Sequence, residues 1–254
     1  MKHALDSVGS LAASLVGGPW GVQISRTARQ PEQLLEVYEM ENCPFCRVVR
    51  NTLTELDLDA LIFPCPKGGD RYRPYVRGRG GKELFPYLHD PNTGARLYES
   101  ADIVTYLYDT YAGGDAPSYA AIKALRTSPS MAASALRFGR GITARPGRLP
   151  EKMLELYSFE GSPYSRLVRE RLCSLEIPYI LRNCGRNLAV EWIVLPALRE
   201  KLAPNYAPTQ RNRKALLART GRMQVPYLID PNTGSEMYES ARILRYLDTT
   251  YGPG

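Results

Sequence analysis

The sequence lacks any uninterrupted run of the ~18 apolar residues that a membrane-spanning helix requires. We therefore expect a protein that is soluble or bound to a membrane only peripherally. Histidine is almost absent: His3 and His89 are the only two, neither has ligand spacing to a cysteine, and we expect no metal site. The five cysteines are an odd number at modest density, which disfavours the disulfide framework of a small secreted protein.

An internal repeat is the main feature that the sequence does contain. The stretch ENCPFCRVVR at 41–50 returns as EGSPYSRLVR at 160–169, and PYLHDPNTGARLYES from Pro86 returns as PYLIDPNTGSEMYES from Pro226. The shift is 119 residues in the first case and 140 in the second, so the second copy contains additional residues between these stretches. They include 189–202, which we expect to form an amphipathic helix at a domain interface.

Each copy shows the hydrophobic pattern of an α/β fold. Strands LLEVYEM and ALIFPC flank a helix that begins at the cysteine motif, an irregular basic segment follows, and a hairpin around DPNTG leads into a last helix. A β-α-β half followed by a β-β-α half is the thioredoxin-like layout, with helices covering the sheet. The small-residue stretches SLAAS at 10–14 and SMAAS at 130–134 predict a packing helix before each copy, which we favour over a membrane-surface anchor. The predicted segments are 1–30 (N-terminal helical segment), 31–113 (domain 1), 114–149 (helical linker) and 150–254 (domain 2).

The C-P-F-C motif gives the first copy a candidate reactive thiol. Cys43 falls where a strand passes into a helix, and free N–H groups and the helix dipole stabilise a thiolate there. Arg47 and Arg50 add positive charge. Cys46 is three residues later on the same helix face, where it can attack a mixed disulfide formed at Cys43. A structural C-x-x-C without redox chemistry is the alternative.

Prolines in the third strand of each copy support this interpretation. A proline within a strand loses a ladder hydrogen bond, so LFPYL and QVPYL predict cis peptide bonds before Pro86 and Pro226. An ordinary edge-strand proline is the alternative.

The run CPFC…FP…YES resembles the glutaredoxin-like N-terminal domain of glutathione transferases. Over roughly 31–112 and 150–251, the chain resembles tandem proteins of plant and algal plastids that contain two such domains and no all-helical C-terminal domain. The resemblance implies a chloroplast location and a glutathione site. In domain 1 the main chain of Phe85, next to Pro86, would pair with the cysteinyl part of glutathione, while Ser100 and Glu99 would bind its γ-glutamyl end. Helix capping by Glu99 and Ser100 is the alternative.

The second copy has Ser162 and Ser165 in place of the two cysteines, so it cannot exchange disulfides. Ser162 resembles the serine of serine-type glutathione transferases, which implies a second glutathione site with Val225, Pro226, Glu239 and Ser240. A purely structural copy is the alternative.

Cys65 follows the second strand and is a candidate third thiol within reach of Cys43, or a small buried core residue. Cys184 occupies the matching position in the second copy, and Cys173 is expected in the core.

Basic residues gather in two matching segments, 66–82 with six against one aspartate and 199–222 with seven against one glutamate. This charge favours glutathione, thiol-containing or acidic proteins, or an acidic lipid surface as partners. Without a recognised binding motif we expect no nucleic acid. The sequence predicts a glutathione-linked thiol-disulfide oxidoreductase; the alternatives are a non-catalytic plastid scaffold or assembly factor, and serine-type transferase activity in domain 2.

Overall fold

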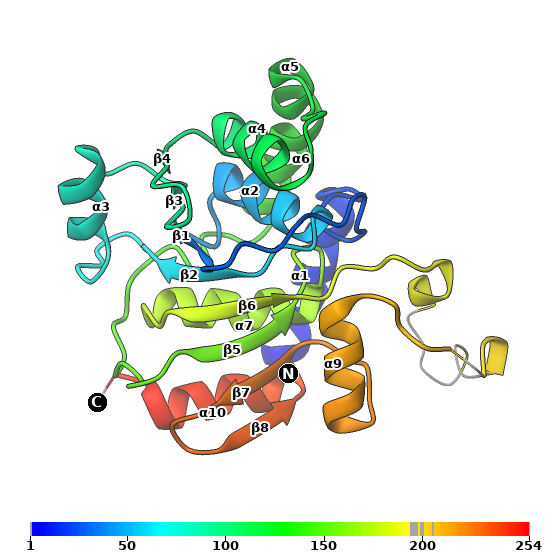
Figure 1. The fold of residues 1–254 in the computed structure, drawn as a ribbon. Helices are drawn as coiled ribbons and strands as arrows, with labels where there is room; N and C mark the ends of the chain where they lie inside the picture. The colour runs from blue at the N-terminus through cyan, green and yellow to red at the C-terminus, as the bar shows by residue number, and fades with distance from the viewer. Residues whose placement is uncertain (1, 194–197, 199–200, 205, 254) are drawn as a thin grey trace.

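The computed structural model describes residues 2–193, 198, 201–204 and 206–253, and its fold is mixed α/β (Figure 1). One continuous sheet of eight strands passes through the described part of the chain in the order β4-β3-β1-β2-β6-β5-β7-β8. Its strands are β1 (Leu35–Glu39), β2 (Ala60–Pro64), β3 (Tyr87–His89), β4 (Arg96–Leu97), β5 (Leu154–Ser158), β6 (Tyr179–Asn183), β7 (Tyr227–Asp230) and β8 (Ser235–Tyr238).

The two halves of the sheet have the same internal pairing. In the first half β1 is parallel to β2 and antiparallel to β3, and in the second half β5 is parallel to β6 and antiparallel to β7. The halves join where β2 pairs antiparallel with β6, with Leu61 opposite Ile180. These two residues are related by the 119-residue shift of the repeat, so the junction is centred on an approximate two-fold axis.

Helices cover both faces of the sheet. Leu35 and Val37 of β1 are buried against the face of α2, α4, α7 and α10, whereas Tyr38 points to the opposite face, which α3 covers with Val76. In the second half α9 packs on that opposite face through Leu216. The helical elements are α1 (Lys2–Val16), α2 (Pro44–Glu55), α3 (Arg73–Gly80), α4 (Ser100–Tyr111), α5 (Tyr119–Ala121), η1 (Ile122–Thr127), α6 (Ser128–Ala135), α7 (Pro163–Ser174), η2 (Ala189–Trp192), α9 (Arg211–Thr220) and α10 (Ser240–Tyr251).

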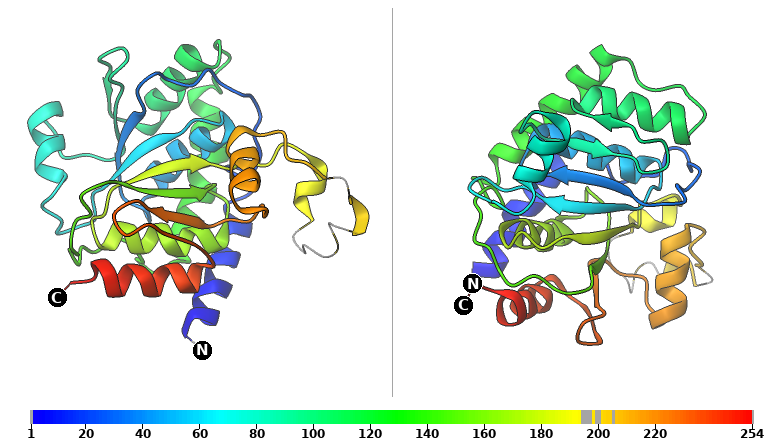
Figure 2. Two further views of the ribbon diagram at one scale, coloured as in Figure 1. Left: turned by 60° about the horizontal axis from the view of Figure 1, so that its bottom comes forward. Right: turned by 60° about the vertical axis from the view of Figure 1, so that its left-hand side comes forward.

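The predicted small-residue helices form an outer layer over α2 and α7. Helix α1 packs on α7 and alongside α6, and α6 packs on α2. Figure 2 shows α1, in dark blue, on the outside of the molecule next to the N-terminus. The Ser10 hydroxyl donates a hydrogen bond to the Pro163 carbonyl at 2.6 Å, and Ala13 and Ala133 are fully buried. Both stretches therefore serve as packing helices, as predicted; no helix in the described ranges has the length and apolar character needed to cross a membrane.

Two segments differ from the prediction. The segment expected to be irregular contains α3, which has Pro74 in its first turn and Gly81, in the left-handed conformation, as its C-cap. Burial of Val76 packs this helix on the sheet. Of the helix expected over 189–202, residues 189–192 form the short 3₁₀ helix η2, and residues 194–197 and 199–200 lie outside the described residues.

The two DPNTG hairpins are closed by buried aspartates. Asp90 accepts hydrogen bonds from the Asn92 amide at 2.8 Å and from the hydroxyls of Tyr106 and Tyr111 on α4. Asp230 has the matching partners in the second half. Each aspartate thus fastens the last helix of its half to the hairpin.

Candidate functional site

Cys43 lies at the start of α2, just beyond the end of β1. Its Sγ accepts a hydrogen bond from the Cys46 amide at 3.3 Å, so the sulfur takes the place of a helix-capping oxygen. The side chain is 8% exposed and Cys46 is fully buried. Because the motif begins the helix, the sulfur of Cys43 faces free backbone N–H groups, as the sequence predicted.

Several donors lower the pKa of Cys43 to about 7. The Cys46 thiol contributes most by donating a hydrogen bond to the sulfur, the backbone amides of Cys46 and Phe45 add to it, and the Arg50 charge acts in the same direction, while burial opposes them. Burial and the hydrogen bond to Cys43 raise the pKa of Cys46 well above its ordinary value. About half of Cys43 is therefore thiolate at neutral pH, whereas Cys46 remains protonated.

The predicted glutathione-binding residues of the first half begin elements at the same sheet edge. The Phe85–Pro86 peptide bond is cis, as predicted, and it precedes β3, which pairs with the end of β1 through Tyr87 and Tyr38. The rings of Tyr87 and Tyr98 lie 4.8 Å apart, so β4 delivers the start of α4 to this edge. Cys43 after β1, the cis-proline before β3 and the N-terminus of α4 after β4 are thus placed by the strand pairing at the same edge of the sheet.

Glu99 and Ser100 mark the start of α4. Glu99 occupies the N-cap position of α4, where it is exposed, has φ 62° and ψ 120°, and makes no side-chain capping hydrogen bond. Its backbone carbonyl accepts a hydrogen bond from the Ile103 amide at 3.0 Å. This backbone conformation is unfavourable for a residue with a Cβ atom, and such strain concentrates at binding sites. Ser100 is buried.

The second half repeats this geometry with oxygen in place of sulfur. Ser162 is 3% exposed, and its Oγ accepts a hydrogen bond from the Ser165 amide at 3.3 Å. The Val225–Pro226 bond is also cis, and Glu239 has φ 68° before the buried Ser240. The Glu239 carboxylate differs from Glu99 in its surroundings, because the Gln224 amide donates to it at 3.0 Å and Arg222 lies 3.8 Å away.

The other three cysteines are buried in the interior. Cys65 packs among the aromatic rings under α3, and its thiol donates only a weak hydrogen bond to the Phe63 carbonyl at 3.5 Å. Burial raises the pKa of Cys65 well above its ordinary value and that of Cys173 likewise. The Sγ of Cys173 accepts a hydrogen bond from the Glu41 amide at 3.4 Å, a contact between the halves.

A buried ion network crosses the junction behind Cys43, and sequence reasoning missed it. Arg50 of α2 reaches across to Glu160 at 2.8 Å, and Arg169 of α7 reaches back to Glu41 at 3.1 Å. Arg50 also pairs with Glu39 at the end of β1. The repeat carries the signal, since the 119-residue shift superposes Glu41 on Glu160 and Arg50 on Arg169.

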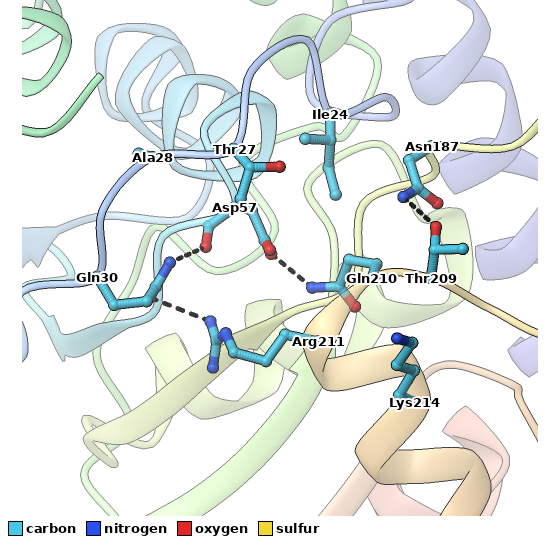
Figure 3. Close-up of a pocket in the computed structure, with 10 residues that line it drawn as sticks. All are labelled: Ile24, Thr27, Ala28, Gln30, Asp57, Asn187, Thr209, Gln210, Arg211 and Lys214. Atoms are coloured by element: carbon cyan, nitrogen blue, oxygen red, sulfur yellow. Dashed lines mark hydrogen bonds between the residues drawn. The ribbon is translucent and has the colours of Figure 1, made fainter. Parts of the chain in front are cut away.

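A separate hollow of about 350 Å³ lies at the start of α9, where Gln210 and Arg211 approach Asp57 (Figure 3). The Gln210 and Gln30 amides donate to the carboxylate and the backbone carbonyl of Asp57, respectively, and Arg211 and Lys214 complete the polar lining. Burial raises the pKa of Asp57 to about 6. None of the predicted site residues lines this hollow.

The mixed sheet, with Cys43 at the start of α2 and a cis peptide bond before Pro86 at the start of β3, has the features of a thioredoxin-like fold. The family model of the glutathione S-transferase, N-terminal domain matches residues 37–115 and 156–254, and the chain belongs to this family. Membership supports a function that involves glutathione. Residues 2–193, 198, 201–204 and 206–253 contain no group of three or more histidine, cysteine or acidic side chains arranged to hold a metal ion.

Other comparisons add little. A solved structure of a trimeric glutathione transferase, Leishmania TDR1, is similar over 87% of this chain and 68% of its own, with 14% identity and a TM-score of 0.28. A likeness at this level carries no argument about the site. None of the curated proteins compared with the chain matches it.

Proposed function

We propose that the first half is a glutathione-linked thiol-disulfide oxidoreductase with Cys43 as nucleophile and Cys46 as resolving thiol. The single observation that carries this proposal is the Cys43 sulfur at the start of α2, hydrogen-bonded by Cys46 and with a pKa of about 7. A thiol with a pKa near the ambient pH combines a large thiolate fraction with good nucleophilicity.

The proposed reaction is thiol–disulfide exchange through a mixed disulfide between Cys43 and glutathione. The Cys43 thiolate attacks the glutathione sulfur of a protein–glutathione mixed disulfide, and the protein thiolate leaves and takes a proton from water. A second glutathione thiolate then attacks the new disulfide, which releases oxidised glutathione and restores the Cys43 thiolate. Alternatively Cys46 loses its proton, attacks the Cys43 sulfur and releases reduced glutathione, leaving a Cys43–Cys46 disulfide that two further glutathiones reduce.

Glutathione binding in this proposal uses the edge where Cys43 lies. The main chain of Phe85 before the cis bond pairs with the cysteinyl part of an extended ligand, the α4 N-terminus at Ser100 receives the γ-glutamyl carboxylate, and Glu99 pairs with the ammonium group. The exposed Glu99 carboxylate, which caps nothing, supports this assignment.

The second half is the place for a second candidate function. We propose that Ser162, Val225, Pro226, Glu239 and Ser240 form a non-redox glutathione site of the serine type, supported by the repeated cis bond and strained glutamate. The near-complete burial of Ser162 favours the competing proposal of a non-catalytic scaffold or assembly factor. Tandem domains at 31–113 and 150–254 and a chloroplast location belong to the proposal through the family resemblance.

Turnover of a glutathionylated peptide by reduced glutathione tests the redox proposal. We expect Cys43→Ser to abolish turnover. Cys46→Ser should retain it through the second-glutathione route, because that variant keeps the nucleophile. Cys65→Ser is the matched control, since it removes a thiol outside the motif; equal loss in Cys65→Ser and Cys43→Ser would contradict the assignment, and full activity of Cys43→Ser would refute it.

A further inference from the structure

Four arginines lie in the buried centre of the molecule, and two of them use up the carboxylates there. Arg50 and Arg169 each contact two or more of the glutamates of the network, at positions 39, 41 and 160. Both guanidinium groups are therefore paired. The same two helices, α2 and α7, also contain a second pair of arginines with far fewer partners.

Arg47 on α2 and Arg166 on α7 are this second pair, related by the repeat. They are 3% and 2% exposed, and the Nε atom of each is buried without a hydrogen-bond partner. Arg47 lies 3.8 Å from an oxygen of Glu160, beyond hydrogen-bond distance, and this oxygen is itself buried without a hydrogen-bond partner. Arg166 donates to the Ser10 carbonyl at 2.8 Å. A buried, unpaired guanidinium N–H is unfavourable, and here it occurs twice at one place.

The charges in this centre do not balance. Four guanidinium groups face three carboxylates and the Cys43 thiol, whose pKa is about 7, and burial raises the pKa of one carboxylate, Glu39, to about 8. The positive charges therefore outnumber the negative charges at neutral pH. Burial and the neighbouring charge of Arg47 lower the pKa of Arg166 to about 9. A water molecule could accept from the free N–H groups, but it would leave the excess positive charge in place.

Three buried hydroxyl groups without partners lie on α7 and on α6, the helix that packs on α2. Ser130 and Ser134 lie on α6, which packs on α2, and Ser165 lies on α7 beside Arg166 in sequence; all three hydroxyls are buried and unpartnered. Buried positive charge with unpaired N–H donors is an environment that proteins offer to an anion.

We propose that Arg47 and Arg166 hold a small inorganic oxyanion, of the sulfate or phosphate class, between the starts of α2 and α7. An oxyanion fits better than chloride because the planar guanidinium group donates parallel N–H groups that match two oxygens. The proposed site does not use Arg50, the arginine that lowers the pKa of Cys43. A bound anion would join the two halves of the chain without taking part in disulfide exchange.

Thermal unfolding of the full chain in sodium sulfate, with ionic strength held constant by sodium chloride, tests the proposal. We expect a saturable rise in Tm of about 5 °C, because a ligand bound only to the native state stabilises it. Arg47→Met and Arg166→Met should lose this rise and, without sulfate, should melt no lower than wild type, since an unbalanced buried charge has been removed. Arg79→Met, at an exposed position of α3, is the matched control and should keep the full rise.

Equal rises in wild type, Arg166→Met and Arg79→Met would mean a general salt effect and would overturn the site. Equilibrium dialysis of the wild-type protein with labelled sulfate keeps the test independent of variant folding. We expect one sulfate per chain, displaced by inorganic phosphate and not by equal chloride. No bound sulfate, or sulfate displaced equally by chloride, would also overturn it.

Discussion

Replacing Cys46 with alanine should raise the pKa of Cys43. The Cys46 thiol is the largest contributor to the low value, and the substitution removes it while leaving the Cys46 and Phe45 amides and the Arg50 charge in place. A hydrogen bond to a charged group contributes ~1.5–3 kcal/mol, which corresponds to about 1–2 pKa units. The midpoint should therefore move from about 7 to roughly 8–9. Cys46→Ser is the matched control, because its hydroxyl can still donate and should hold the midpoint near the wild-type value.

The assay is the rate of iodoacetamide modification of Cys43 against pH, followed by peptide mass spectrometry. Cys65, Cys173 and Cys184 serve as internal controls, since they are buried with raised pKa values and should stay unmodified in the native protein. A wild-type midpoint at or above 8.5, or identical midpoints for the alanine and serine variants, would refute this account of the thiolate.

Three further predictions concern the buried charges. Arg50→Met should lower the free energy of unfolding in urea by ~3–5 kcal/mol, because it leaves glutamates of the network without their partner. The control Arg77→Met, at an exposed position, should change the free energy of unfolding by under ~1 kcal/mol. An equally small effect of Arg50→Met would contradict the network. Burial raises the folded pKa of Glu39 to about 8, above its ordinary value of 4.5, so the stability that the protonated Glu39 contributes is lost as pH rises from about 4.5 to 8. The stability of the wild type relative to Glu39→Gln should therefore fall over this range, and parallel pH–stability curves would disprove this. Although burial opposes it, hydrogen bonds from Tyr106 and other donors keep the pKa of Asp90 below its ordinary value of 3.8, so its contribution is present at neutral pH and is lost as the pH falls through the folded pKa. Asp90→Asn should destabilise by ~1–3 kcal/mol at pH 7 and progressively less as the pH falls below 3.8, and a pH-independent difference would be against it.

Local signals in the sequence were enough to predict the elements around the site. Val48, Val49 and Leu53 on one face of α2, and Leu56 at its C-cap, are fully buried, because their spacing follows the helical period. Both cis bonds were also predicted, since a proline inside a strand pattern forfeits a ladder hydrogen bond and therefore marks a special backbone position.

The junction between the halves could not be predicted in the same way. Pairing of β2 with β6 needs only two strand edges of compatible shape, and Leu61 and Ile180 look like ordinary strand residues in the sequence. The ion network depends on that pairing, because Arg50 meets Glu160 only once the two strands are adjacent. Long-range contacts of this kind leave a sequence signal only as matching positions of a repeat.

Intact-mass analysis after exposure to oxidised glutathione is the most direct test of the central claim, that Cys43 exchanges disulfides with glutathione. We predict an internal disulfide in the wild type, a stable glutathione adduct at Cys43 in Cys46→Ser, and no adduct in Cys43→Ser. An adduct that persists in Cys43→Ser, or a wild-type chain that remains fully reduced, would contradict the account.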